Sequence, residues 1–180
     1  SDLTSLATVL DEDNLKKYSL HLHNLWSEYC INDPEITISA PKTLTVQASL
    51  DALSHSLESI WNRNANPIST NYAIGAVKII IETLPLLIED LNNINLRTNI
   101  MFASLNAGLA FSNTQTSIAH AISYYITLKR NVPHGIACSF TLPLIIDFLI
   151  ENKLPVVNDI QTAIGKDFKV KIENLLKIAN

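Results

Sequence analysis

Four side chains in this 180-residue chain are of types that bind divalent metal ions, and their spacing suggests that they could act together. Asp51 and His55 stand four residues apart in DALSHSLESIW, which has helical periodicity, so both project from one helix face about one turn apart. His120 follows in SIAHAISYYI, also helical in period, and His134 in VPHG, where Pro133 can open another helix. Imidazole nitrogens and a carboxylate suit zinc or ferrous iron, and such a site can leave a position open for substrate. The sequence therefore predicts a metal centre built from three segments.

The spacing also permits a simpler explanation without a metal. An aspartate and a histidine four residues apart arise by chance in many helices. A lone histidine on an apolar helix face is more often a hydrogen-bonded core residue than a ligand. Spacing alone therefore leaves both a metal centre and a set of packed histidines open.

The elements that must position these residues are helical from Pro41 onward. Apolar residues recur at intervals of three and four, as they do on the buried face of a helix. Ser69 is the expected cap of the second helix, and Pro85 is expected to end or kink it. We expect helices over residues 42–61, 69–84, 96–111, 115–127, 133–150, 156–164 and 168–178.

The first forty residues have a different pattern, with apolar and β-branched residues and turn signals between them. SDLTSLATVL and KKYSLHLHN are predicted strands joined by the turn DEDN, so they form a hairpin. Tyr29–Ile31 is predicted to add one more short strand before the turn Asn32-Asp33-Pro34. The fold class is therefore mainly α, with a β segment at 1–40 and an all-helical domain at 41–180.

Composition limits the classes of partner. Hydrophobic residues make up 47% of the chain and charged residues 17%, which suits a well-buried helical domain. The net charge of −4 provides no basic footprint, so we expect no nucleic-acid partner. No signal peptide opens the chain and the apolar runs are short, so we expect no membrane partner. Cys30 and Cys138 stand alone in apolar contexts, as reduced thiols of a cytoplasmic protein do, although a disulfide is not ruled out by the sequence.

Three runs, DALSHSLE, ASLNAGLAFSNTQTSIAHAIS and PHG, resemble the helical domain of iron-dependent (group III) alcohol dehydrogenases. The resemblance covers Ser1 to about Asn152. In that family the metal is bound by the Asp and His of D-A-L-x-H, a His in the helix after F-S-N, and the His of P-H-G. The matching positions here are Asp51, His55, His120 and His134. The resemblance thus implies a dehydroquinate synthase-like helical metal-binding domain that holds Fe²⁺ or Zn²⁺.

The resemblance also implies a nicotinamide cofactor. In the family a T-T-x-G-T-G-S-E loop touches the cofactor just before this point, and Ser1-Asp2 resembles its last two residues. Residues 1–40 would then complete a nucleotide-binding domain that this chain lacks, so we expect no dehydrogenase activity from the chain alone. Thr4 and Lys17 match positions that contact NAD(P)H, although a surface lysine beside a turn explains Lys17 equally well.

Two further positions bear on the substrate. Phe111 matches a position that lines the substrate pocket in relatives, and Tyr124 replaces a second histidine that many members carry near the nicotinamide. PHGIACSFTLP, SHSLESIWN and NANPIS are similar to phosphonoacetaldehyde reductases. The implied function is a metal- and NAD(P)-dependent alcohol dehydrogenase or aldehyde reductase acting on a small molecule, as a single chain or a homo-oligomer.

Two other classes of function stay open at this point. A lyase of the related dehydroquinate synthase type would share the Asp/His metal site, but it demands a cluster of basic residues that the sequence does not show. A non-catalytic helical module would keep the motifs and bind a ligand or partner without turnover. An upstream glycine-rich dinucleotide turn in the full gene would favour the dehydrogenase over the module.

Overall fold

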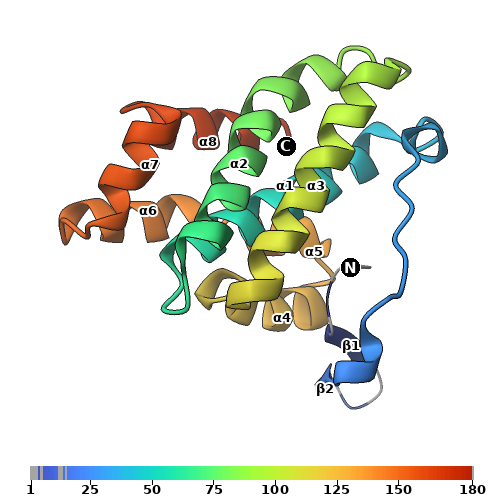
Figure 1. Ribbon diagram of the computed structural model, residues 1–180, viewed down its shortest axis with the longest axis horizontal. Coiled ribbons are helices and arrows are strands. Elements are labelled where there is room, and N and C mark those ends of the chain that lie inside the picture. The colour runs from blue at the N-terminus through green and yellow to red at the C-terminus, as the bar shows by residue number, and fades with distance from the viewer. Residues whose placement is uncertain (1–3, 5, 12–13, 15, 180) are drawn as a thin grey trace.

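A β-hairpin opens the chain in the computed structural model, which describes residues 4, 6–11, 14 and 16–179 (Figure 1). Strands β1 (Leu6–Asp11) and β2 (Lys16–His21) pair antiparallel, with Val9 opposite Tyr18. Asn14 supports the turn, because its backbone N–H and side-chain amide both donate to the Asp11 carboxylate. The predicted hairpin is confirmed, while residues 12, 13 and 15 of its turn lie outside the described part.

The segment after the hairpin contains two short 3-10 helices, η1 (His23–Leu25) and η2 (Pro34–Thr37). The strand predicted at Tyr29–Ile31 is wrong, since that stretch is irregular. Tyr29 is 85% exposed and Ile31 is 90% exposed, and no strand of the described chain pairs with them. A β-branched and aromatic run forms a strand only where a neighbouring strand can accept its hydrogen bonds.

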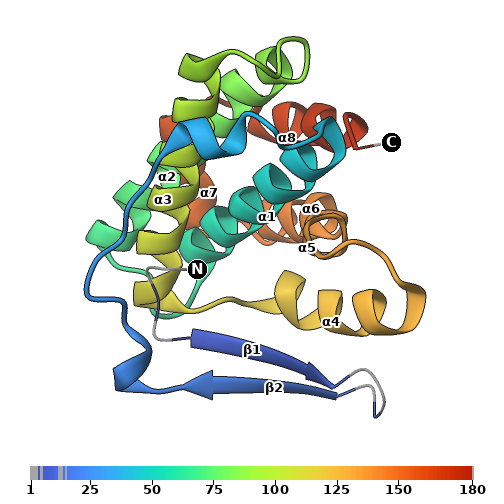
Figure 2. The same ribbon diagram turned by 90° about the vertical axis from the view of Figure 1, so that its right-hand side faces the viewer.

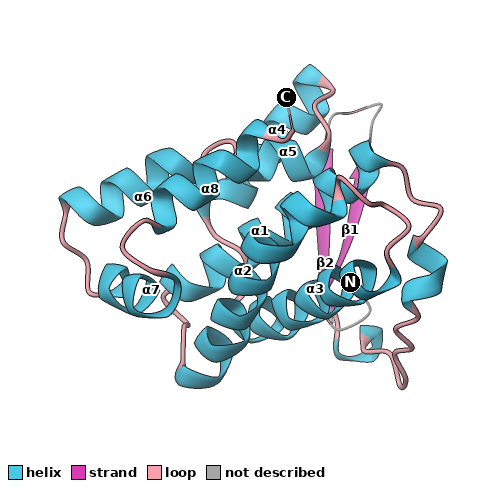
Figure 3. Cartoon of the chain, turned by 90° about the horizontal axis from the view of Figure 1, so that it is seen from above, coloured by secondary structure: helices cyan, strands magenta, loops and turns pink. Residues whose placement is uncertain are grey.

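Eight α-helices make up the rest of the chain, and α1 lies among α2, α3, α4 and α5. Figure 2 shows the hairpin at the edge of this bundle, at the same end as α4, and Figure 3 shows α6, α7 and α8 at the opposite end. The core is formed by leucine, isoleucine, valine and alanine side chains of several helices. The helices are α1 (Lys42–Trp61), α2 (Pro67–Leu87), α3 (Ile94–Thr114), α4 (Ile118–Arg130), α5 (His134–Ser139), α6 (Leu142–Glu151), α7 (Val156–Ile164) and α8 (Phe168–Lys177).

The residue that caps the start of α2 differs from the predicted one. Asn66 is the N-cap: its side-chain oxygen accepts from the backbone N–H groups of Ile68 and Ser69, at 3.1 Å each. The Ser69 hydroxyl accepts from the Asn66 backbone N–H at 3.0 Å and completes a capping box. Ser69 is therefore the third helical residue rather than the cap, and the helix continues through Pro85 to Leu87.

The prediction of a single helix over residues 133–150 is also wrong, because the helix is interrupted at Phe140 and Thr141, between α5 and α6. Pro143 explains the break: it has no N–H to donate, and its ring would clash with the carbonyl of Ser139 in a continuous helix. The interruption separates the short helix that carries His134 and Cys138 from α6.

Two stretches pass a length and composition test for a membrane-spanning helix, Pro67–Leu87 and His134–Glu151, contrary to our expectation that the apolar runs would be too short. The fold accounts for the first of them. Along α2 the side chains of Ala73, Val77 and Ile80 are fully buried in the core. A central helix of a bundle is apolar for this reason, so the test is weak evidence for a membrane span.

Candidate metal centre

Helix α1 presents three ionisable side chains on one face. Asp51, His55 and Glu58 follow each other at intervals of four and three residues, which places them along a single stripe of the helix. The Asp51 side chain is 30% exposed, whereas Glu58 is fully buried. This stripe faces α4 and α5, both of which contact α1.

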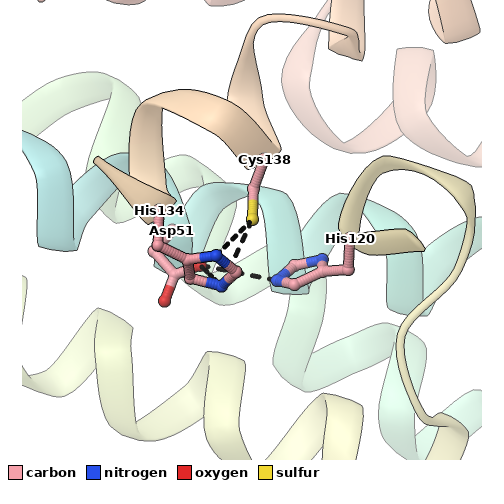
Figure 4. Close-up of side chains that lie close together, drawn as sticks. All are labelled: Asp51, His120, His134 and Cys138. Atoms are coloured by element: carbon pink, nitrogen blue, oxygen red, sulfur yellow. Dashed lines mark hydrogen bonds and ion pairs between the residues drawn. The ribbon is translucent and has the colours of Figure 1, made fainter. Parts of the chain in front are cut away.

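The carboxylate of Asp51 is the meeting point of the three predicted histidines. His55 Nε2 lies 3.6 Å from Asp51 Oδ2, His120 Nε2 lies 3.4 Å from Oδ1, and His134 Nε2 lies 3.6 Å from Oδ1. Figure 4 shows His120 and His134 converging on Asp51 from different helices. All four predicted ligands are thus brought together by α1, α4 and α5.

These separations fit ligands around an ion better than direct hydrogen bonds. Asp51 Oδ1 and His120 Nε2 are both buried, and neither has a hydrogen-bond partner. A tetrahedral ion with bonds of about 2.0–2.1 Å would hold its nitrogen and oxygen ligands roughly 3.3–3.4 Å apart. Because buried polar atoms normally have partners, the pair of unsatisfied atoms facing one point fits a bound divalent metal.

His55 has a distinct position in the cluster. Its ring is stacked between Phe111 and His120, with both centroid separations at 4.1 Å. Its Nδ1 is buried without a hydrogen-bond partner, and its Nε2 approaches the carboxylate oxygen that the other two histidines do not approach. Stacking on Phe111 limits the rotation of the His55 ring. The packing of the core therefore sets how closely His55 Nε2 can approach the Asp51 carboxylate.

Glu58 is a functional candidate that the sequence analysis missed. Its carboxylate accepts the backbone N–H of Ser117 at 2.8 Å and that of Ala119 at 2.6 Å, and it lies 2.6 Å from His120 Nδ1. A carboxylate accepts rather than donates, so the Nδ1 proton of His120 points at Glu58 and the Nε2 lone pair is left for a metal. In the sequence, the feature that could have indicated Glu58 is its spacing of seven residues from Asp51 on an apolar helix.

Cys138 is a second residue that the sequence analysis did not place at the site. It stands four residues after His134 on α5, and its Sγ lies 3.4 Å from His134 Nε2. Ligand atoms of Asp51, His120, His134 and Cys138 all lie within 4.8 Å of one another. The i, i+4 spacing from a predicted ligand was the available signal for it.

Gly135 allows α5 to approach α1 closely enough to bring His134 to Asp51. A Cβ atom at this position would overlap the backbone carbonyl of Gln47 on α1, with the carbonyl carbon only 2.8 Å away. No side chain larger than hydrogen fits there without moving one helix, because backbone atoms cannot rotate out of the way. The glycine of P-H-G therefore has a packing role at the site.

The electrostatics of the metal-free cluster follow from two carboxylates on either side of His120. Burial opposes its charge, but contacts with Asp51, Cys138 and Glu58 outweigh burial and raise the pKa of His120 to about 12. Burial alone would raise the pKa of Asp51 and of Glu58, yet their close contacts with the His120 ring hold both pKa values below the usual range. Burial lowers the pKa of His55 and outweighs its contact with Asp51. Two carboxylates thus flank the position where a cation would bind, and the proton that His120 holds in the metal-free state would leave when a metal takes its place.

The remaining predicted site residues differ in what the structure shows of them. Phe111 is buried against His55, and Tyr124 lies parallel to the ring of His134 with centroids 6.0 Å apart, so both border the cluster. Thr4 is buried just before β1. Lys17 pairs with Leu10 in the hairpin, but its side chain lies outside the described part, as do Ser1 and Asp2. The cofactor contacts of Thr4 and Lys17 stay predictions.

Comparison with known proteins identifies related sequences. Residues 45–179 match the C-terminal part of the Fe-containing alcohol dehydrogenase family. The NAD-dependent methanol dehydrogenase of Bacillus methanolicus is 32% identical over 148 residues, which are 82% of this chain and 39% of that protein. The sulfoacetaldehyde reductase of Bilophila wadsworthia is 31% identical over the same length and 38% of its own. The chain therefore spans about two fifths of the length of these relatives.

Solved structures agree with the sequence matches. The iron-containing alcohol dehydrogenase of Thermotoga maritima superposes with a TM-score of 0.85 and 30% identity, over 97% of this chain and 47% of that one. The sulfoacetaldehyde reductase of Bifidobacterium kashiwanohense, solved in complex with NAD⁺, superposes with a TM-score of 0.88 and 26% identity, over 98% of this chain and 48% of that one. By sequence and by fold, this chain belongs to the Fe-containing alcohol dehydrogenase family, whose C-terminal part it matches.

Proposed function

We propose that this chain provides the metal-binding helical half of a metal- and NAD(P)-dependent alcohol dehydrogenase or aldehyde reductase. The observation that carries the proposal is the convergence of three imidazoles on the Asp51 carboxylate, with His120 Nε2 buried and unsatisfied. A core packed with histidines for stability alone would satisfy these atoms by hydrogen bonds. The family relationship supports the same chemistry.

The residues that would hold the metal are Asp51, His55, His120 and His134. When bound, Fe²⁺ or Zn²⁺ at such a site polarises a substrate oxygen as a Lewis acid, and NAD(P)H supplies the hydride. Within the chain, Glu58 keeps the Nδ1 proton of His120 and so orients the other ring nitrogen toward the site.

The rings beside the cluster would shape the space for substrate. Phe111 covers one face of His55, which keeps water from that side of the cluster, and Tyr124 lies along His134 with a phenol that can donate a hydrogen bond. The division into a cofactor-facing segment at 1–40, with Thr4 and Lys17, and a metal-binding domain at 41–180 is part of the same proposal. We also propose that the protein works in the cytoplasm.

We propose phosphonoacetaldehyde, a two-carbon aldehyde with an anionic group, as the substrate. The sulfoacetaldehyde reductases among the relatives act on a similar molecule, by their names, although methanol and propanol dehydrogenases occur there too. Reduction of phosphonoacetaldehyde, sulfoacetaldehyde and propanal by the full-length protein tests the choice. The proposal expects the highest kcat/KM for phosphonoacetaldehyde, and equal values for propanal would contradict it.

Anaerobic calorimetric titration with Fe²⁺ and with Zn²⁺ tests the metal centre directly in this chain. We expect one ion to bind, and binding to be lost in Asp51→Asn and His120→Ala, because each change removes a ligand from the cluster. Asp159→Asn is the matched control, since this carboxylate is exposed on α7 and belongs to no part of the cluster.

The outcomes of the titration separate the possible functions. Binding that all three variants share would place the ion elsewhere and contradict the proposed centre. Absence of binding in the unaltered chain would also contradict it and would favour a non-catalytic helical module. Binding together with turnover of a carboxylated or phosphorylated substrate, rather than hydride transfer, by the full-length protein would favour the lyase type.

A further inference from the structure

Neither the motifs nor the family resemblance supplies a role for Cys138. Its side chain is fully buried on α5, one helical turn after His134. Its Sγ lies within 4.8 Å of the ligand atoms of Asp51 and His120 as well as those of His134. Figure 4 shows the sulfur directed at the same point as the other three side chains.

A hydrogen bond to His134 does not account for this position. Sγ is almost equally far from the two ring nitrogens, 3.4 Å from Nε2 and 3.6 Å from Nδ1. A hydrogen bond is directional and would bring the sulfur along the lone pair of a single nitrogen. The thiol instead faces a point that the unsatisfied Asp51 Oδ1 and His120 Nε2 also face.

We propose that Cys138 is a ligand of the metal centre, in the place that the family resemblance gives to His55, and that it shifts the preference of the site from ferrous iron toward zinc. The inference rests on the proposed metal centre and goes beyond it by replacing one nitrogen ligand with a sulfur. The thiol proton leaves to solvent as the bond between Sγ and the metal forms, and no electron is transferred. Thiolate is a soft ligand, and soft ligands favour zinc.

One separation agrees with such a set. Zinc bonds of about 2.3 Å to sulfur and about 2.0–2.1 Å to nitrogen separate the two ligand atoms by roughly 3.6 Å in a tetrahedron. The separation of Sγ from His134 Nε2 is 3.4 Å. His55 approaches Oδ2 rather than Oδ1, so Asp51, His120, His134 and Cys138 form a four-ligand set without it. Zinc can expand to five ligands, which leaves room for a substrate oxygen.

Titration with Co²⁺ under anaerobic conditions tests the sulfur ligand, because a bond from thiolate to Co²⁺ produces a charge-transfer band in the near ultraviolet. We expect the band in the unaltered chain and in Cys30→Ala, the matched control for the other thiol. Cys138→Ala and Cys138→Ser should lose the near-ultraviolet band and keep the visible bands of Co²⁺ bound to nitrogen and oxygen. The serine variant preserves side-chain volume if the alanine variant does not fold.

Competition between Zn²⁺ and Fe²⁺ measures the proposed preference. The affinity for zinc should fall at least about 10-fold in Cys138→Ser, since a lost ligand costs no less than the loss of a residue that supports one, and the affinity for iron should fall less. Cobalt binding without the near-ultraviolet band in the unaltered chain would overturn the sulfur ligand and leave the Asp/His centre intact. Absence of cobalt binding would overturn both.

Discussion

At the scale of single residues, the character of the site depends on how His120 is oriented. The ring is fixed between two carboxylates, Glu58 at Nδ1 and Asp51 near Nε2. Glu58 also accepts the backbone N–H groups of Ser117 and Ala119, so a side chain of α1 satisfies the first amides of α4. The same carboxylate thus positions both the proposed ligand His120 and the helix that carries it.

Replacement of Glu58 by glutamine tests this positioning role. We expect Glu58→Gln to weaken zinc binding roughly 10- to 100-fold while leaving every proposed ligand in place, since supporting residues of metal ligands typically contribute this much. Chelator competition measures the affinity, and circular dichroism checks the fold. Glu173→Gln on α8 is the control, and an unchanged affinity in Glu58→Gln would show that His120 is oriented without Glu58.

At the scale of elements, the short helix α5 decides whether the site forms. It contacts α1 and α4, and Gly135 lets it approach the Gln47 carbonyl. Sequence periodicity cannot show this approach, because it depends on which helix packs against α5.

Gly135→Ala should separate α5 from α1. We expect a loss of about 1–3 kcal/mol in the free energy of unfolding, from overpacking against backbone, together with weaker zinc binding because His134 moves away from Asp51. Urea denaturation and zinc titration measure the two effects. Gly75→Ala is the matched control: its Cβ would meet Asn106 Nδ2 at an ordinary 3.7 Å, so it should be neutral or stabilising by up to about 1 kcal/mol.

A second set of contacts between helices lies away from the proposed metal centre. The guanidinium of Arg97 on α3 is 3% exposed and donates to the Leu91 and Ala40 carbonyls and to the Thr45 hydroxyl, at 2.8 to 3.0 Å. It therefore joins the start of α1 and the chain just before it to the start of α3. Burial lowers the pKa of Arg97, but an arginine keeps its charge at any physiological pH.

Arg97→Met should destabilise the chain without altering the metal centre. We expect a loss of about 1–3 kcal/mol in the free energy of unfolding, because the part-buried carbonyls of Leu91 and Ala40 lose their donor. The stoichiometry of zinc binding should not change. Arg63→Met, at an exposed position, is the control in the same denaturation experiment, and equal stability of the two variants would contradict the role of Arg97.

At the scale of the whole molecule, the site joins helices that are far apart along the chain. Glu58 and His120, for example, are separated by 62 residues. A metal bound by α1, α4 and α5 together would bind the folded chain and not the unfolded one. Its binding free energy then adds to the stability of the whole fold.

Zinc should therefore raise the free energy of unfolding, by about 4 kcal/mol when free zinc is roughly 1,000 times the dissociation constant. Thermal denaturation with and without zinc measures the effect, and a chelator should reverse it. His120→Ala should show no such shift, while Asp159→Asn should behave as the unaltered chain does. A zinc-dependent shift retained by His120→Ala would mean that the ion binds outside the cluster.

The sequence by itself determined the local features of this protein. The helix around Asp51 and His55 and the turn of the hairpin depend on residues that are neighbours in the chain, so the sequence predicted both. The motifs also indicated the family and the four candidate site positions. The failures were at Tyr29–Ile31, at the Asn66 cap and at the break before Pro143. A strand forms only beside a partner strand. The helix cap and the helix interruption depend on which of several possible local hydrogen bonds form in the folded chain.

Only the tertiary structure decided which side chains meet. The buried bond between Glu58 and His120, the position of the Cys138 sulfur, and the stacking of His55 on Phe111 each join different helices or rest on how α5 packs. Such contacts depend on close packing of the core, to within a fraction of an ångström, rather than on residue type or spacing. For that reason spacing could name the candidate ligands of this chain, and only the packed helices could show which of their atoms face the proposed metal position.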